Sequence, residues 1–335
     1  MARGRPTIYT IAERAGVSIS TVSLAINHPQ RVAPNTRRRI AEVAAELGYR
    51  PDTPSGERRG GRRGGVGVAG PFTSVASYAR RLNGILTELR GTGIDVTVYD
   101  LPSAERVDAP LLDTLPIRPG VDGIIVLGIP LSAEGAARLS AWGPPVVLID
   151  VANSEVGGVR VDDLAGGELV GSHLAALGHR RVAFVHPPQR SFSYVSAGML
   201  RHDGLVRALG RADGPTAVVP VEVTDPDPAA IAEQVLAVPG VTAAFAHTDL
   251  IAGRLRAGLI ARGIGVPDQF SVVGYDDGEL AETLGLTTVR QPLEETGRAG
   301  ARMLLDLMDQ GACESESIIL DPELVERATT APAPA

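Results

Sequence analysis

Small hydroxyl side chains cluster at the start of a short helical stretch near the N-terminus. Residues 7–23 place a glycine, Gly16, between two short helical patterns, and the second opens with serine and threonine residues. Small residues at such a start let a helix lie deep in the major groove of DNA, where hydroxyls and backbone N–H groups reach phosphates. The alternative is a plain helical hairpin, which the basic character of this end of the chain disfavours.

The formal charge is distributed unevenly along the chain. The 335 residues carry −7 in total, but residues 1–63 hold twelve arginines and five acidic residues, which is +7 and leaves −14 for the remainder. Such a split is typical of a terminal segment that is attracted to phosphate and a body that is repelled by it.

Residue types that support catalysis or metal binding lack the necessary spacing. The six histidines show no H-x-x-x-H pattern, Cys313 has no disulfide partner, and no G-x-S-x-G nucleophile element occurs. His173 and His179 are expected at a helix surface or a helix end. Residues 65–70 spell G-x-G-x-x-G, but a dinucleotide site needs this motif after a strand, and here it is itself the first strand. We therefore predict no metal, no cofactor and no enzymatic activity.

Targeting signals are not apparent in the sequence. The basic first residues are not followed by an apolar run, and no stretch approaches the apolar length that spans a bilayer. We expect a cytoplasmic protein without membrane contact.

Three short helices are predicted at the N-terminus, each bounded by residues that cap helices well. The first runs over 8–15 with Thr7 as its N-cap, the second is capped by Ser18 or Ser20 and runs to residue 26, and the third spans about 34–47. Their apolar residues would form a miniature core: Ile11, Ala15, Val22, Ile26, Ile40, Val43 and Leu47.

A linker and a larger body follow. Residues 52–65 are dense in glycine, proline and arginine, which indicates a linker. Beyond them, apolar runs alternate with amphipathic helical patterns, as in parallel sheets covered by helices on both faces. Two doubly wound α/β lobes are therefore expected, with ligands at the carboxyl ends of their strands. The predicted strands are Val66–Ala69, Ile94–Tyr99, Gly123–Leu127, Val146–Ile149, Val182–Val185, Ala217–Val221, Ala243–Ala246 and Ser271–Val273.

Several longer segments follow one another in an order that is specific to one family. They are TIYTIAERAGVSISTVS with Asn27 after it, VAPNTRRRIAEVAAELGYRP (32–51), VRVDDLAGGELVGSHLAALGHRRVAFV (159–185), SVVGYDD (271–277), LTTVRQPLEETGRAGARMLL (286–305) and LDPELVERATTAP (320–332). Together they resemble the lactose-repressor/galactose-repressor family over essentially the whole chain.

This resemblance implies an architecture and a function. The body would have periplasmic-binding-protein type I architecture, with a small-molecule effector, of carbohydrate type, in a cleft between two lobes. A homodimer would read a pseudo-palindromic operator in double-stranded DNA as a transcription regulator, a repressor controlled by the effector. The implied domains are a helix-turn-helix head of 1–51, a hinge of 52–65, lobe 1 of about 66–161 and 292–319, and lobe 2 of about 162–291 and 320–335.

Two departures from the family concern DNA contact. Many members have a base-contacting arginine where this chain has Leu24, which offers only an apolar contact such as to a thymine methyl. Pro54 and Gly56 disfavour the usual hinge helix, and Arg58 stands near the place of its leucine wedge. The hinge arginines either follow the DNA or belong to a solvated linker. The implied DNA-binding residues are Thr7, Tyr9, Ser18, Ile19, Ser20, Thr21, Ser23, Leu24, Asn27, Arg31, Thr36, Arg58 and Arg59.

The resemblance also places polar residues around the effector. Carboxylates and a guanidinium that converge from strand ends can pair with vicinal hydroxyls or a carboxylate. Many sugar-binding members have asparagine at the position of Thr248, so the match has gaps. The implied effector-binding residues are Tyr78, Asp150, Arg201, Thr248, Asp249 and Asp276. Further aromatic residues that could stack on a ligand, but that also suit a core, are Phe72, Trp142, Phe192, Tyr194 and Tyr275.

Two other functions compete with regulation. A solute-binding protein of sugar-transport type would have similar lobes, but it would need an export signal and no basic helical head. An enzyme acting on a sugar could use the acid pairs 162–163 and 276–277. Adjacent residues in a strand point to opposite sides, however, so a structural or binding role suffices for these acids.

Overall fold

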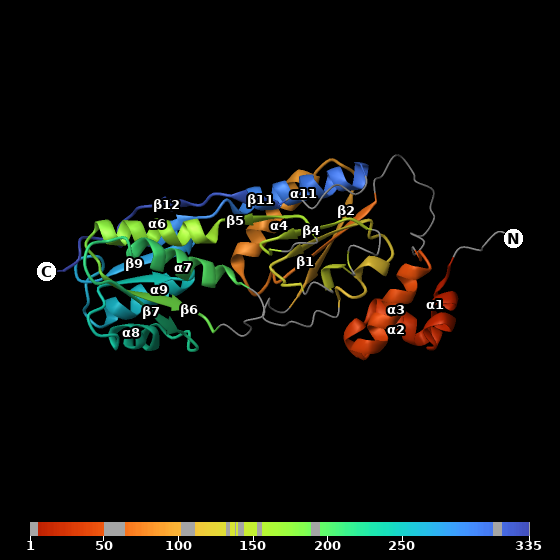
Figure 1. Ribbon diagram of the computed structural model, residues 1–335, viewed down its shortest axis with the longest axis horizontal. Coiled ribbons are helices and arrows are strands. Elements are labelled where there is room, and N and C mark those ends of the chain that lie inside the picture. Colours follow the sequence, from red (N-terminus) through yellow and green to blue (C-terminus); the bar gives the residue numbers. More distant parts are fainter. Residues whose placement is uncertain are drawn as a thin grey trace. The chain divides into compact units, whose positions relative to one another are not determined.

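The computed structural model describes residues 6–49, 64–101, 111–131, 135–137, 139, 144–152, 156–188, 195–310 and 317–334. The chain divides into two compact units (Figure 1). Unit 1 comprises Met1–Arg160 and Leu293–Ile319, and unit 2 comprises Val161–Pro292 and Leu320–Ala335. We call residues 6–49 of unit 1 the head and its described residues from 64 onward lobe 1.

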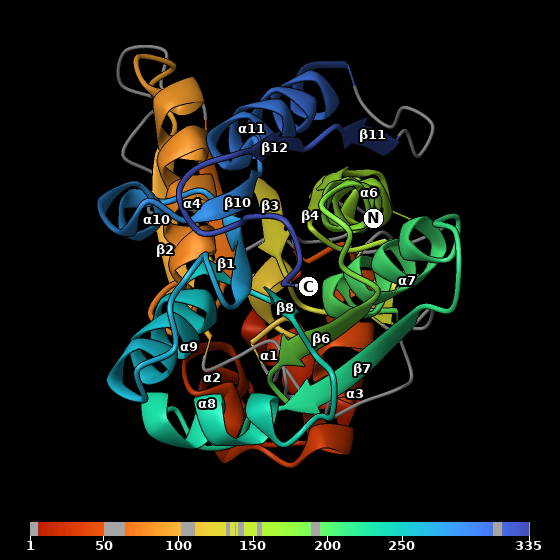
Figure 2. The same ribbon diagram turned by 90° about the vertical axis from the view of Figure 1, so that its left-hand side faces the viewer.

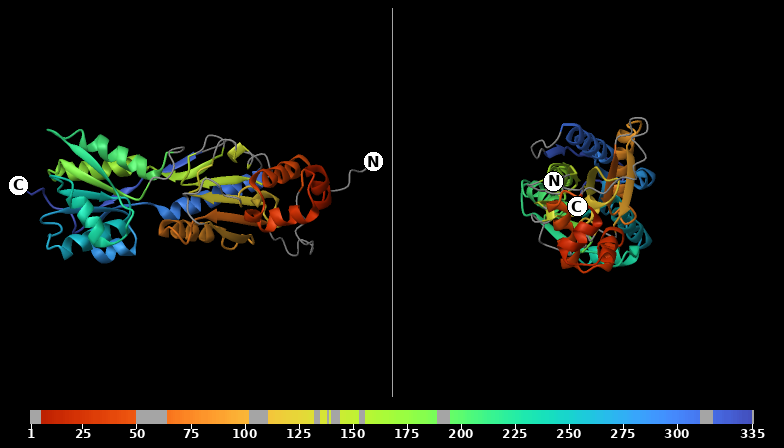
Figure 3. Two further views of the ribbon diagram at one scale, coloured as in Figure 1. Left: turned by 90° about the horizontal axis from the view of Figure 1, so that it is seen from below. Right: turned by 90° about the vertical axis from the view of Figure 1, so that its right-hand side faces the viewer.

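The head consists of short helices (red in Figure 3), and capping residues set where the first two begin. Thr7 forms a reciprocal capping box with Thr10 at the start of α1, and Gly16 ends this helix in the left-handed conformation with φ 64°. Ser18, rather than Ser20, caps α2 through the backbone N–H of Thr21. The elements are α1 (Ile8–Ala15), α2 (Ile19–Asn27), the 3₁₀ turn η1 (Pro29–Arg31) and α3 (Pro34–Glu46). The predicted miniature core is buried except for Leu47, which packs against it and is partly buried.

Lobe 1 is built on a six-stranded sheet with the order β11-β5-β4-β3-β1-β2. One face is covered by α4 (Ala76–Leu89) and α11 (Leu293–Gln310), and the other by a segment that includes η2 (Leu115–Ile117). Parallel pairs join the five strands from β5 to β2. The strands are β1 (Gly65–Gly70), β2 (Asp95–Asp100), β3 (Gly123–Leu127), β4 (Val146–Ile149), β5 (Gly158–Val161) and β11 (Ser317–Leu320).

Unit 2 repeats this plan with the strand order β12-β10-β9-β8-β6-β7. The neighbouring strands β8, β6 and β7 are labelled in Figure 2. The helices α6 (Asp163–Ala176) and α7 (Ala197–Leu209) cover one face, while α8 (Pro228–Leu236) and α9 (Asp249–Ala261) cover the other. A short helix, α10 (Glu279–Leu284), follows β9. The strands are β6 (Arg181–His186), β7 (Ala217–Glu222), β8 (Ala243–Ala246), β9 (Ser271–Asp276), β10 (Thr287–Arg290) and β12 (Glu323–Val325).

The predicted fold class, a helical head followed by two doubly wound α/β lobes, is confirmed. Four strands were missed, namely β5, β10, β11 and β12, because each is only three or four residues long and none is a continuous apolar run. The eight strands that were predicted all pair in parallel, as expected. The additional strand β12 lies antiparallel to β10. The expectation that helices cover both faces of every strand is wrong for β2, which is an edge strand with Val98 exposed. Among the described residues, no helix has the length and apolar character to cross a membrane.

Candidate nucleic-acid and effector sites

The start of α2 presents a compact set of hydroxyl groups. Ser18 Oγ lies 2.7 Å from Ser20 Oγ and 2.8 Å from Thr21 Oγ1. Beside them, Ile19 is 41% exposed, and Tyr9 of α1 is 64% exposed. Apolar side chains this exposed in a small folded module are candidates for a binding role, and backbone N–H groups at a helix start attract phosphate. This end of α2 is therefore suited to DNA contact.

The second half of α2 is held by its own contacts. Asn27 Nδ2 donates to the backbone carbonyl of Ser23 at 3.0 Å, and both side chains are exposed. Leu24 is only partly buried and packs against the core of the head, so part of its side chain is available to a partner. Arg31 is exposed and Thr36 is half-buried. The predicted contacts Arg58 and Arg59 lie outside the described residues.

In lobe 1, the structure brings together two of the predicted effector residues. Asp150 follows the carboxyl end of β4 with φ 64°, a conformation that few residues other than glycine adopt. Its carboxylate accepts from Tyr78 Oη at 3.1 Å and lies 3.2 Å from Arg81 Nη2. Arg81 is almost completely buried in α4 and was missed by sequence reasoning, because an arginine in a helix is ordinarily expected to be exposed. Asp150 is thus held by neighbouring side chains from α4.

In unit 2, Arg201 belongs to a buried polar cluster between two helices and the sheet. Arg201 Nε donates to Asp163 Oδ1 at 2.8 Å, and its guanidinium lies 3.6 Å from the ring centroid of Tyr275. Tyr275 Oη donates to the same carboxylate oxygen at 3.1 Å. Burial opposes the charge of Arg201, but the adjacent Asp163 carboxylate raises the arginine's pKa overall.

A glycine allows the two helices of this cluster to pack closely. A Cβ atom on Gly167 of α6 would collide with the backbone of Arg201, so the missing side chain is what lets α6 and α7 approach. The expectation that residues 162 and 163 occupy a strand is wrong. Asp162 caps α6 by accepting from Ala165 N at 2.9 Å, and Asp163 lies in the first turn of that helix. A structural role for these two acids follows.

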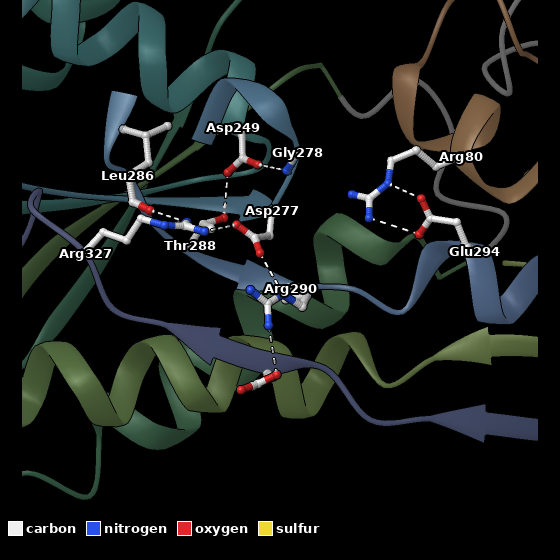
Figure 4. Close-up of polar contacts among 10 residues, drawn as sticks. Arg80, Asp249, Asp277, Gly278, Leu286, Thr288, Arg290, Glu294 and Arg327 are labelled. Atoms are coloured by element: carbon white, nitrogen blue, oxygen red, sulfur yellow. Dashed lines mark hydrogen bonds and ion pairs between the residues drawn. The ribbon is translucent and has the colours of Figure 1, made fainter. Parts of the chain in front are cut away.

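Asp249 and Thr248 lie where β8 gives way to α9. Thr248 caps α9 by accepting from Ile251 N at 3.4 Å. Asp249 accepts from Thr288 Oγ1 at 2.6 Å and from Gly278 N at 3.2 Å (Figure 4). Burial, with the nearby charges of Asp276 and Asp277, raises the pKa of Asp249 to about 7 against the opposing effect of the Thr288 hydrogen bond. Both side chains already accept hydrogen bonds within unit 2, so a ligand that binds them would add to or replace these bonds.

Asp276, the last residue of β9, and Asp277 have consecutive positive φ angles of 118° and 51°. Such angles are costly for residues other than glycine and persist where surrounding contacts enforce them. Asp276 accepts from Gln291 Nε2 at 2.6 Å. Asp277 accepts from Arg327 Nη2 and from Arg290 Nε, each at 2.7 Å (Figure 4). Although burial opposes it, these two arginines lower the pKa of Asp277, which fixes a charged anchor directly after Asp276.

Two histidines of unit 2 have buried contacts that the sequence did not indicate. His179 lies at the end of α6, which is one of the two expected positions, and its backbone N–H donates to the carbonyl of Leu174 at 3.0 Å. Its ring is buried, with Nδ1 2.8 Å from Thr242 Oγ1 and Nε2 3.1 Å from Ser271 Oγ. His247 follows β8, where its carbonyl accepts from Arg201 Nη1 at 2.8 Å. Burial, Arg201 and His186 hold the pKa of His247 well below its ordinary value. His247 was missed because a lone histidine carries no spacing signal.

The predicted effector residues therefore fall into two groups. Tyr78 and Asp150 lie in lobe 1, whereas Arg201, Thr248, Asp249 and Asp276 lie at or beside the carboxyl ends of β8 and β9 in unit 2. Tyr275 is fully buried, and Phe72 packs against the core of lobe 1. Trp142, Phe192 and Tyr194 lie outside the described residues. Within the described part of the chain, no three histidine, cysteine or acidic side chains converge as metal ligands would.

The raised pKa of Asp249 predicts a pH-dependent stability. Its folded pKa of about 7 lies above the ordinary 3.8, so the folded state binds the extra proton and stability is lost as pH rises from about 4 to about 7. The slope is up to about 1.4 kcal/mol per pH unit. Asn at this position mimics the protonated acid, so Asp249→Asn should remove this loss.

The measurement is calorimetric unfolding of both proteins between pH 5 and about 7.5. His173 and His179, whose pKa values burial lowers, act in the opposite sense and are common to both proteins. The difference between the two proteins therefore isolates Asp249. A parallel pH dependence in wild type and variant would contradict a protonated Asp249.

Comparison with known proteins connects these elements to one family. Residues 7–52 match the family of bacterial regulatory proteins described as lacI, and residues 172–330 match a periplasmic binding protein-like domain. The transcriptional regulator CelR of Thermobifida fusca is 31% identical over 97% of this chain and 98% of its own.

Solved structures agree with this match. A complex of the regulator CelR with cellobiose superposes with a TM-score of 0.68 at 29% identity, covering 97% of this chain and 100% of that one. The lac repressor dimer bound to operator and the anti-inducer ONPF superposes with a TM-score of 0.66 at 26% identity, covering 98% and 99%. These relatives are transcription regulators, and the similarity includes both the head and the two α/β lobes.

Proposed function

The chain belongs to the lacI family of bacterial regulatory proteins and is a DNA-binding transcription regulator, and from this premise we propose that it is a repressor released or engaged by a carbohydrate effector. The observation that carries this proposal is the combination of an exposed hydroxyl-rich helix start in a basic head with polar residues at the carboxyl ends of two α/β sheets. The matched head argues against a solute-binding protein that serves a transporter. Binding to chromosomal DNA places the protein in the cytoplasm.

The DNA-binding surface of the proposal is the face of the head that carries the start of α2. Ser18, Ser20 and Thr21 would bind phosphates through hydroxyls and backbone N–H groups, while Ile19 and Leu24 would touch apolar base edges. The remaining members of this surface are Thr7, Tyr9, Ser23, Asn27, Arg31 and Thr36, together with Arg58 and Arg59 of the linker. Two heads of a homodimer would read the two halves of a pseudo-palindromic operator.

The effector-binding residues of the proposal are Tyr78 and Asp150 of lobe 1 and four residues of unit 2. A carboxylate such as Asp276 accepts two hydroxyl hydrogen bonds, and a guanidinium such as Arg201 donates to ring or hydroxyl oxygens, which suits a sugar. Thr248 and Asp249 complete this set. The buried pairs Asp150–Arg81 and Arg201–Asp163 hold these groups in fixed orientations, which lowers the entropy cost of binding.

The test combines a sugar screen with one variant. The full chain is melted with monosaccharides and disaccharides that include cellobiose and ribose, and a bound sugar raises the melting temperature by mass action. The same sugar should change affinity for an operator selected in vitro. Asp276→Ala should lose both responses. Its ligand-free operator affinity should stay within about twofold of wild type, which corresponds to a change of only about 0.4 kcal/mol in binding free energy.

A matched control makes the result specific. Asp268 is exposed and precedes the opposite end of β9, so Asp268→Ala removes the same charge without reaching the candidate site. It should keep the sugar responses. Full sugar responses in Asp276→Ala would remove this residue from the effector site, and a chain that selects no operator would refute regulation by DNA binding.

A further inference from the structure

Arg37 of α3 is a buried charge in the head, because its side chain is only 2% exposed. Nη1 donates to the carbonyls of Pro29 at 3.4 Å and Val32 at 3.2 Å. These carbonyls belong to the first residue of η1 and to the residue that follows this turn. The turn η1 begins one residue after the capping residue His28 closes α2, the recognition helix of the proposed DNA-binding surface. Nε donates to Asp113 Oδ2 at 2.7 Å, and Asp113 belongs to lobe 1. A single guanidinium thus connects the turn after the recognition helix with lobe 1.

An apolar contact accompanies this ion pair. Ile117 of η2 is 2% exposed and is buried in the same cluster as the core residues of the head, among them Ile11 and Ile40. Leu112 and Leu115, from the same segment, are buried in a core cluster of lobe 1. Residues 111–117 therefore face two ways, with Asp113 and Ile117 toward the head and the two leucines toward the sheet.

The docked head keeps its DNA-binding surface open. Ser18, Ile19 and Ser23 are exposed, whereas the contact with lobe 1 is made by Arg37 of α3 and by the buried core of the head. A docked head can accordingly still meet DNA. Docking would also remove part of the orientational entropy that a head on a Gly/Pro/Arg-rich linker must lose on binding.

We propose that Asp113 is a positioning residue for operator binding, which acts through Arg37 to dock the head on lobe 1 in the orientation that reads DNA. A buried ion pair adds little net stability but can specify one geometry, and here the apolar contact of Ile117 reinforces it. The contact links α3, and through Arg37 the turn that follows α2, to lobe 1 without using residues 52–65. This goes beyond the proposed repressor function, since it requires no effector.

The experiment uses the full chain and an operator selected in vitro with the wild-type protein. Asp113→Asn should weaken operator binding about tenfold, although the loss of a negative charge by itself would favour DNA. The slope of log affinity against log salt should stay unchanged, because the number of phosphate contacts is the same. Ile117→Ala, which acts through apolar contact alone, should weaken binding in the same direction. Asp306→Asn removes an exposed charge from α11 and should bind at least as tightly as wild type.

A second measurement reports docking without DNA. A dye on Glu13→Cys, in a Cys313→Ser background, reports motion of the head by time-resolved fluorescence anisotropy. The head should move with lobe 1 in wild type and Asp306→Asn, and independently of it in Asp113→Asn and Ile117→Ala, with the melting temperature of the body kept. An independently moving wild-type head, or operator binding in Asp113→Asn as tight as or tighter than wild type, would overturn the proposal.

Discussion

Fragment 64–335 is expected to bind the selected operator at least about 10³-fold more weakly than the full chain, the smallest usual ratio between specific and non-specific DNA affinity. The fragment lacks every hydroxyl of the recognition helix, and its formal charge is −14, against +7 for the segment removed. Repulsion between this body and DNA leaves no electrostatic term to replace the lost contacts. Fluorescence anisotropy of labelled operator at several salt concentrations measures the change.

Controls separate this result from misfolding. The fragment should unfold cooperatively and retain the thermal response to any sugar that stabilises the full chain, because both α/β sheets are complete without the head. Operator binding by the fragment at the affinity of the full chain would show that DNA contact lies in the lobes, and the assignment of the head would then be wrong.

Arg201→Ala is expected to destabilise unit 2 by about 3–5 kcal/mol, the usual cost of removing one partner of a buried ion pair. The variant leaves Asp163 buried without its guanidinium, and it removes the group stacked 3.6 Å from the ring centroid of Tyr275. It also leaves the carbonyl of His247 without this donor. Chemical denaturation followed by far-UV circular dichroism checks the loss.

The matched control removes a surface ion pair that also connects the α7 region with α6. Arg211, just beyond α7, pairs with Glu168 of α6 at 3.3 Å on the surface, so Arg211→Ala should cost under about 1 kcal/mol. Arg201→Met combined with Asp163→Asn should cost less than Arg201→Ala, since no buried charge is stranded. Equal losses in Arg201→Ala and Arg211→Ala would show that Arg201 is not a buried structural charge in solution.

The helices of the head could be placed from sequence because local interactions set them. The caps Thr7 and Ser18 bond to backbone groups three residues away, and Gly16 supplies a left-handed residue where α1 must end. The central strands β3, β4 and β8 were located to the residue, since continuous apolar runs of this length are suited to burial in a sheet. The hinge hypothesis, by contrast, concerns residues outside the described part of the chain and stays a prediction.

The short strands and the partners of buried charges required the tertiary structure. β10 contains two buried threonines. The backbone N–H of Thr287 donates to the side-chain hydroxyl of Thr329, which lies 42 residues further along the chain. Nothing near Arg37 in sequence indicates burial, because its partner Asp113 is 76 residues away and its helix neighbours are also arginines.

Local signals determined the helices of the head, the strands with continuous apolar runs and the basic charge that favours DNA, because capping, periodicity and charge act over a few residues. The tertiary structure decided which polar groups have buried partners, and therefore which residues support structure while serving a site. Asp249 and Arg201 were predicted from resemblance as ligand contacts, and each proves to be hydrogen-bonded within unit 2. The physical reason is that the cost of burying a charge depends on groups that only folding brings within bonding distance.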